Sequence, residues 1–303
     1  MTARDLFYEP PPSGLLRPIW RLLGFCLVAF FCWRVGAWLL VTVVRPRSIP
    51  WPWRALAYQV IGVSSLLAAV LFAHLVMLRW VDRLPWSEVG LGARQLSPRA
   101  LGIGFALGLL GIGIPCGVLL AAHWLAVGPG NAPGESLAVF ALGSGLFFLP
   151  QALAEEMTSR GYIFAVLRRA GGWQVALLAT SLLFGMGHVA NPNVRLLPIF
   201  VVVLAGLFLG GILVATGSLY AAWMAHFAWN WTMLGLFHAR VSGVPVPVPG
   251  YSIGNSGPDW LTGGQWGPEG GVAAALGMTA GLAALWAWRS RNPGSVDGGA
   301  ADA

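Results

Sequence analysis

Residues 196–216 read LLPIFVVVLAGLFLGGILVAT, and this stretch decides the fold. It holds no charged side chain. A helix needs about 20 consecutive apolar residues to cross the hydrocarbon core of a bilayer. The stretch is therefore predicted to be a membrane-spanning helix.

Composition extends this prediction to the whole chain. Of the 303 residues, 57% are hydrophobic and 10% are charged, whereas soluble domains carry about 25% charged residues. These values exclude a disordered chain, a disulfide-stapled scaffold and an ordinary soluble enzyme. They leave a multi-span membrane protein.

Seven more apolar runs of suitable length lie along the sequence. They cover residues 22–44, 55–77, 101–127, 137–168, 173–189, 219–237 and 271–288. With 196–216 they predict an all-α, polytopic transmembrane bundle of about eight helices. We expect a transmembrane domain over 22–288, a cytoplasmic segment over 1–21 and a disordered tail over 289–303. The longest loop, 238–270, is rich in proline and glycine and is expected to be irregular.

The arginines predict how the chain is oriented. All 18 basic residues are arginine, and they lie mostly between the apolar runs. With the N-terminus inside, eleven of them face the cytoplasm and five face out. The positive-inside rule then places both termini in the cytoplasm. The net charge of +7 forms no basic groove or arm, so the bilayer is the expected partner and nucleic acid is not.

The absence of lysine, with so much alanine and glycine, is typical of a GC-rich genome. We therefore expect an integral protein of the plasma membrane of a bacterium.

Three apolar runs contain polar side chains that are costly inside a bilayer. Glu155, Glu156 and Arg160 lie in QALAEEMTSRGYIF, while His188 lies in SLLFGMGHVANPN. Glu156 and Arg160 are at i and i+4, so they share a helix face and can neutralise each other. Glu155 is rotated about 100° away and is expected to lack an intrahelical partner. A carboxylate without a partner in a low-dielectric site suits a general base.

Depth gives a second reason to group these residues. Glu155 lies 13 residues before Arg168, and His188 lies 15 residues after Trp173. A helical rise of 1.5 Å per residue converts these separations to about 20 Å and about 22 Å. The two arms of this hairpin therefore place Glu155 and His188 at similar depth.

The seventh run adds two more polar side chains, in AAWMAHFAWNW. His226 and Asn230 are at i and i+4 there, hence on one helix face. If that face looks inward, Glu155, His188, His226 and Asn230 converge in an intramembrane polar pocket.

The three motifs together resemble those of the CAAX prenyl protease and bacteriocin-processing family of intramembrane proteases. The matching positions are Glu155-Glu156-x-x-x-Arg160, Phe184-x-x-x-His188 and His226-x-x-x-Asn230. Their order agrees, and Gly161 after Arg160 fits the usual pattern. The resemblance covers the motif-bearing core, residues 137–237. One such motif is weak, but three in order in a polytopic chain form a fairly specific signal.

The resemblance implies a role for each matching position in an endopeptidase that acts on a membrane-associated peptide or protein, which could carry a lipid. Glu155 would activate a water, and His188 would hold and polarise it. His226 and Asn230 would stabilise the oxyanion of the tetrahedral intermediate. The supporting residues Glu156, Arg160 and Phe184 complete the motifs, with the ion pair orienting Glu155.

Metal dependence is left open by the residues. Glu155, His188 and His226 could supply a carboxylate and two imidazoles to Zn²⁺, with a fourth position for water. The same side chains could also act without metal, with Glu155 as base. The sequence contains neither H-E-x-x-H nor G-x-S-x-G, and no cysteine lies within a motif, which disfavours a covalent nucleophile.

Two other functions fit parts of the pattern. Intramembrane Glu, His and Arg also mark the ion pathway of a proton-coupled transporter, although no inverted repeat accompanies them. A non-catalytic bacteriocin-immunity protein is the third candidate.

Other polar and small residues have ordinary interpretations. His74 and His123 have no polar partner at helical spacing and are interpreted as packing or interfacial residues. Close helix packing is expected at three small-xxx-small pairs, namely Gly104–Gly108, Gly206–Gly210 and Gly277–Gly281.

Overall fold

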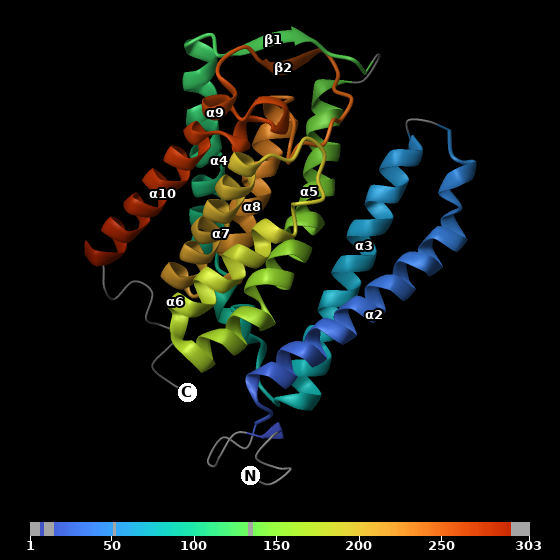
Figure 1. Ribbon diagram of the computed structural model, residues 1–303, viewed down its shortest axis with the longest axis vertical. Coiled ribbons are helices and arrows are strands. Elements are labelled where there is room, and N and C mark those ends of the chain that lie inside the picture. The colour runs from blue at the N-terminus through green and yellow to red at the C-terminus, as the bar shows by residue number, and fades with distance from the viewer. Residues whose placement is uncertain (1–6, 9–14, 51–52, 133–135, 292–303) are drawn as a thin grey trace.

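The computed structural model describes residues 7–8, 15–50, 53–132 and 136–291. Within these ranges the chain is a bundle of long helices with a two-stranded antiparallel ribbon at one end (Figure 1). The predicted all-α bundle is confirmed. Most of the predicted tail, residues 292–303, lies outside the described residues, and so do 1–6 and 9–14 of the predicted N-terminal segment.

Eight helices in the described ranges correspond to the eight predicted segments. They are α2 Pro18–Val44, α3 Trp53–Leu75, α4 Pro98–Ala121, α5 Leu137–Arg160, α6 Tyr162–Met186, α7 Leu196–Thr216, α8 Leu219–Trp231 and α10 Val272–Arg291. π-Helical turns extend α3 over Val76–Val81 and α8 over Thr232–Leu236. The shorter elements are β1 Leu125–Pro129, β2 Tyr251–Asn255 and α9 Asp259–Thr262.

Length and composition support six spanning stretches in the described residues. One of them, Leu137–Met186, contains both α5 and α6. α8 is not among the six, even with its π-helical turns. Its side chains are instead mostly buried among the other helices.

Three sequence predictions about boundaries are wrong. The run 101–127 does not stay helical, because α4 ends at Ala121 and β1 then pairs with β2. The loop 238–270 is less irregular than expected, since it contributes β2 and α9. The run 137–168 is not one helix either: α5 ends at Arg160, and Gly161 (φ −80°, ψ −117°) leaves the helical region. The predicted turn near Gly172 is present, with φ of 84° at that glycine.

Small residues hold the centre of the bundle together, as predicted. A Cβ added at Gly104 or Gly108 of α4 would collide with the backbone carbonyl of Ala221 or Ala225 on α8. A Cβ at Gly206 would lie 2.7 Å from Ser181 Cα of α6, and one at Gly277 of α10 would collide with the Gly111 carbonyl. Such close approach lets helix backbones pack in lipid, where the hydrophobic effect between helices is lost.

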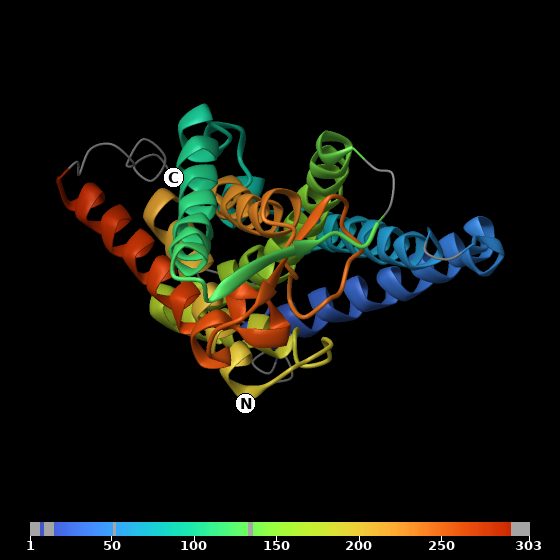
Figure 2. The same cartoon turned by 90° about the horizontal axis from the view of Figure 1, so that it is seen from above.

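The α2–α3 hairpin stands apart from this centre. Figures 1 and 2 show it leaning away from the other helices on one side, while α10 lies on the opposite side. Its main polar joint with α6 is buried: Arg21 contacts Asp82 at 2.6 Å, and the Tyr162 hydroxyl donates to the same Asp82 oxygen at 2.6 Å. Arg21, predicted to face the cytoplasm, is 2% exposed.

Candidate active site

The acidic residues of the first motif lie on the last turns of α5. Glu156 is fully buried and accepts a hydrogen bond from Arg160 Nη1 at 2.9 Å, the predicted i, i+4 ion pair. Arg160 also donates to the Gly206 carbonyl of α7 at 3.2 Å, and its guanidinium lies 4.1 Å from the centre of the Phe184 ring. The pair therefore ties α5 to α6 and α7.

His226 of α8 lies between the two adjacent carboxylates. Its Nδ1 is 2.9 Å from Glu156 Oε1, and its Nε2 is 3.7 Å from Glu155 Oε2. A carboxylate oxygen only accepts hydrogen bonds, so Nδ1 carries a proton and Nε2 faces Glu155. The local charge is uneven, because Arg160 compensates Glu156 while Glu155 has no arginine contact among the described residues.

Glu155 has a partner on its own helix, which corrects the sequence prediction. Gln151, one turn earlier, donates from Nε2 to Glu155 Oε1. The Oε1 atom of Gln151 in turn accepts from Asn230 Nδ2 of α8 at 3.3 Å. The second Glu155 oxygen, Oε2, is buried and lacks a hydrogen-bond partner in the part of the chain that the structure describes.

His188 lies just beyond α6, with Phe184 between it and His226. Its Nδ1 bonds the Phe184 carbonyl at 2.8 Å, which leaves Nε2 as an acceptor. The Phe184 ring is 4.8 Å from the His188 ring and 5.7 Å from the His226 ring, measured between ring centres. The i, i+4 spacing of the second motif thus places a phenyl ring against both imidazoles.

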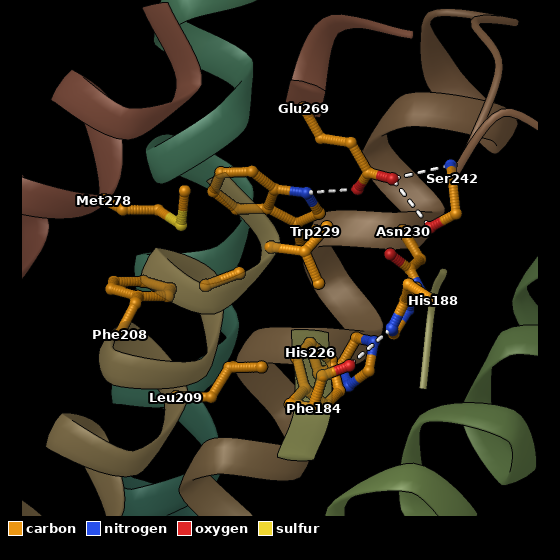
Figure 3. A pocket seen from close by; sticks show the side chains of 12 residues that line it. Phe184, His188, Phe208, Leu209, His226, Trp229, Asn230, Ser242, Glu269 and Met278 are labelled. Carbon is orange, nitrogen blue, oxygen red and sulfur yellow. Dashed lines mark hydrogen bonds between the residues drawn. The ribbon is translucent and has the colours of Figure 1, made fainter. Parts of the chain in front are cut away.

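A pocket opens beside these imidazoles (Figure 3). Its lining includes six apolar side chains, Phe184, Val202, Ala205, Phe208, Leu209 and Met278, and six with polar groups, His188, His226, Trp229, Asn230, Ser242 and Glu269. Three of the four residues predicted to converge therefore share a pocket. Glu155 does not line it and adjoins it through His226 and Gln151.

Glu269 enters the pocket from the loop before α10. It accepts hydrogen bonds from Trp229 Nε1 at 3.1 Å and from the backbone N and Oγ of Ser242 at 2.6 and 2.8 Å, as Figure 3 shows. The sequence does not point to Glu269, because no local spacing links it to α8. Gln151 was not predicted either, although its i, i+4 position before Glu155 was a usable signal.

The break at Gly161 depends on a residue from another helix. His74 of α3 is fully buried; its Nδ1 donates to Val70 O at 2.7 Å, and its Nε2 accepts the Tyr162 N–H at 3.0 Å. It therefore has a polar partner that helical spacing could not predict. A Cβ at Gly161 would collide with His74 Nε2, so only glycine fits without a shift. This break also invalidates the depth estimate, which assumed a straight helix from Glu155 to Arg168.

The predicted zinc ligands are only partly assembled. His226 Nε2 and Glu155 Oε2 face each other, and His226 Nδ1 has the carboxylate partner that metal-binding histidines commonly have. A catalytic zinc takes three protein ligands. Within the described ranges no three His, Cys, Asp or Glu side chains form a group that could hold a metal ion. The residues do not fit a three-ligand site in this arrangement, and the zinc site stays a prediction.

Long apolar helices that enclose carboxylate, imidazole and amide groups define an integral membrane protein with a polar site among its helices. Residues 136–232 match a family model described as type II CAAX prenyl endopeptidase Rce1-like. The match runs from the start of α5 to the end of α8, and it confirms the resemblance read from the motifs. No curated protein and no solved structure matches the chain significantly.

Proposed function

We propose that the chain is an intramembrane endopeptidase that hydrolyses a peptide bond in a membrane-associated peptide or protein. The observation that carries the proposal is the surplus carboxylate Glu155, which faces His226 Nε2 inside the region that matches the Rce1-like family model. The family description supports a protease and hence a peptide or protein substrate. The residue roles below rest on the geometry and on the resemblance.

Glu155 acts as general base. Its Oε2 and the His226 Nε2 are 3.7 Å apart, too far for a direct hydrogen bond. A water that donates to Oε2 keeps a lone pair free to attack a carbonyl carbon. The attack forms the new C–O bond, transfers the water proton to Glu155 and places negative charge on the carbonyl oxygen. Collapse then breaks the C–N bond, and Glu155 returns the proton to the leaving amine.

Asn230 and His226 stabilise the oxyanion. Asn230 Nδ2 carries two hydrogens and donates one to Gln151, so the other is available to the substrate oxygen. Glu156 holds His226 Nδ1, so Nε2 is the nitrogen that faces the reacting groups and donates when it is protonated. His188 presents Nε2 to the pocket as an acceptor that orients the water.

The substrate class is tested with quenched peptides in lipid nanodiscs. One peptide ends in a cysteine, two aliphatic residues and a variable residue, with an S-farnesyl group; the other has the same sequence without the lipid. We expect the wild-type protein to cleave at least one of them, with the site mapped by mass spectrometry. Preference for the farnesylated peptide supports a lipidated substrate, whereas equal rates support a peptide selected by sequence.

The base is tested with Glu155→Gln and a matched control, Glu88→Gln. The two side chains are similarly exposed, 27% and 24%, but Glu88 pairs with Arg168 and Arg169 away from the site. Removing a general base lowers kcat by about 100- to 10,000-fold. Full cleavage by Glu155→Gln and by His226→Ala would reject the proposal.

Zinc binding and the orientation of the chain in the membrane are tested by separate experiments. Metal analysis of the purified protein, with cleavage measured after chelation, tests whether Glu155, His188 and His226 bind zinc. We propose that both termini lie in the cytoplasm, as the arginine distribution indicates. Reporter fusions at each terminus test that orientation.

A further inference from the structure

Gln151 is the one described side chain that hydrogen-bonds both the proposed base and a proposed oxyanion donor. It lies on α5, one turn before Glu155, and is partly buried. Its amide donates from Nε2 to Glu155 Oε1 and accepts at Oε1 from Asn230 Nδ2, 3.3 Å away. No sequence motif includes this residue.

The direction of these bonds follows from the chemistry of the groups. A carboxylate has no proton to donate when ionised, so the Gln151 group that faces Glu155 is the amide NH₂. The carbonyl oxygen of Gln151 then points toward α8 and requires a donor. Asn230 can meet that requirement only with its own NH₂. The charge on Glu155 thus sets the orientation of two amides in sequence.

This orientation matters for the proposed reaction. An oxyanion is stabilised by N–H donors placed in advance, not by a carbonyl oxygen. If the Asn230 amide were reversed, its oxygen would face the developing negative charge. Gln151 prevents that reversal, because the reversed amide would bring two carbonyl oxygens together.

Other hydrogen bonds hold α8 against α5 near Gln151. Trp223 and Trp231 of α8 donate from their indole nitrogens to the carbonyls of Leu149 and Ala141 on α5, at 2.7 and 2.8 Å. These bonds fix α8 against α5 independently of Gln151. Loss of the Gln151 amide is therefore expected to change side-chain orientation more than helix packing.

We propose that Gln151 is a positioning residue that orients Glu155 and, through its carbonyl oxygen, the NH₂ group of Asn230. The inference rests on the proposed endopeptidase function. It adds a residue that couples the base on α5 to the oxyanion donor on α8.

The test uses Gln151→Met, which keeps the length of the side chain and removes both hydrogen-bonding groups. The full-length protein in nanodiscs is assayed with whichever of the two quenched peptides the wild type cleaves faster. We expect kcat to fall by about 10- to 100-fold, the worth of one or two hydrogen bonds to charged or polar groups, with KM unchanged. The control is Gln174→Met, which removes an exposed glutamine on α6 and should match the wild type.

A double-variant cycle separates positioning from a general structural effect. In an Asn230→Ala background, Gln151→Met should lower kcat by a smaller factor, because the amide that it orients is gone. Gln151→Glu provides a second variant of nearly the same size. It keeps an acceptor for Asn230 but, when ionised, it cannot donate to Glu155 and repels that carboxylate, so kcat should fall.

The outcomes distinguish this inference from the proposed function. The positioning role is overturned if both Gln151 variants keep the wild-type kcat, or if they raise KM and leave kcat unchanged. The proposed function survives that result as long as Glu155→Gln lowers kcat as expected. If Gln151→Met lowers kcat by the same factor in the Asn230→Ala background as in the wild type, the link to Asn230 is overturned. If the wild type cleaves neither peptide, or Glu155→Gln cleaves as well as the wild type, the proposed function fails and the inference fails with it.

Discussion

Two regions of this protein each bury an arginine against a carboxylate. In the region that matches the Rce1-like family model, Arg160 pairs with Glu156, and both side chains are fully buried. At the joint between the α2–α3 hairpin and α6, Arg21 pairs with Asp82, at 2% and 0% exposure. The geometry is similar, with N–O distances of 2.9 and 2.6 Å.

The difference lies in what each carboxylate holds besides its arginine. Asp82 also accepts from the Tyr162 hydroxyl, and its pairing with Arg21 makes the joint neutral, with no second acid in contact among the described residues. Glu156 accepts from His226, whose other nitrogen faces a second carboxylate, Glu155. A buried ion pair alone therefore does not mark an active site. The surplus acid next to an imidazole is the feature that supports chemistry.

The largest expected effect comes from removing either arginine. Arg21→Met and Arg160→Met each leave a buried carboxylate without its cation, which costs about 3–5 kcal/mol of folding free energy. Thermal unfolding in one detergent measures both. Removing the paired charge as well should recover most of that loss, so Arg21→Met/Asp82→Asn and Arg160→Met/Glu156→Gln are expected to unfold near the wild-type temperature.

Activity then separates the two regions. The Arg21→Met/Asp82→Asn protein should cleave peptide at the wild-type rate, because neither residue contacts the proposed site. The Arg160→Met/Glu156→Gln protein should remain at least about tenfold slower, since a neutral amide holds His226 Nδ1 less strongly than a carboxylate. Equal activity in the two double variants would contradict the distinction drawn between the pairs.

A smaller effect is expected where the two regions meet, at Gly161. Gly161→Ala places a Cβ against His74 Nε2 and the Met157 carbonyl. Such overpacking costs about 1–3 kcal/mol. Gly143→Ala in α5, the helix that ends just before Gly161, is the control, because nothing lies within 4 Å of a Cβ there.

The His74 imidazole, with which the Cβ of Gly161→Ala collides, can be removed by a second substitution. In a His74→Ala background, Gly161→Ala should cost less than it does alone, since the colliding imidazole is absent. Unfolding temperatures of the four proteins give the coupling. Additive losses would show that the Met157 carbonyl, rather than His74, makes glycine necessary.

Helix geometry explains which parts of the site could be predicted from sequence. Glu156 meets Arg160, and Phe184 meets His188, because residues four apart share a helix face whatever the tertiary fold. The small-residue pairs were predictable for the same reason. Long apolar runs gave the helices, since few other structures satisfy the backbone in lipid.

Contacts between distant segments explain what could not be predicted. The break after Arg160 lies inside an apolar run and is stabilised by His74, 88 residues before Tyr162. Glu269 reaches Trp229 from a loop with no periodic pattern. In the β1–β2 ribbon, β1 precedes α5 in the sequence and β2 follows α8. The apolar run 101–127, which was predicted to be helical throughout, therefore ends in a strand whose partner is distant in the sequence.

The last comparison contrasts two single glycines, Gly108 in α4 and Gly62 in α3. Gly108→Ala drives a Cβ into the Ala225 carbonyl of α8, whereas nothing lies within 4 Å of a Cβ at Gly62 in α3. We expect the first to lose about 1–3 kcal/mol and the second to gain about 0.5–1 kcal/mol, because alanine restricts the unfolded chain and favours helix. Unfolding in one detergent compares them directly.

The same pair of variants links packing to activity. α8 carries His226 and Asn230, so a shift of α8 away from α4 changes their distances to Glu155 and Gln151 on α5. Gly108→Ala should therefore lower kcat, while Gly62→Ala should leave it unchanged. If Gly108→Ala unfolds earlier yet cleaves at the wild-type rate, then α8 moves together with α5, and the indole hydrogen bonds between those helices, rather than the glycine contacts with α4, set the geometry of the site.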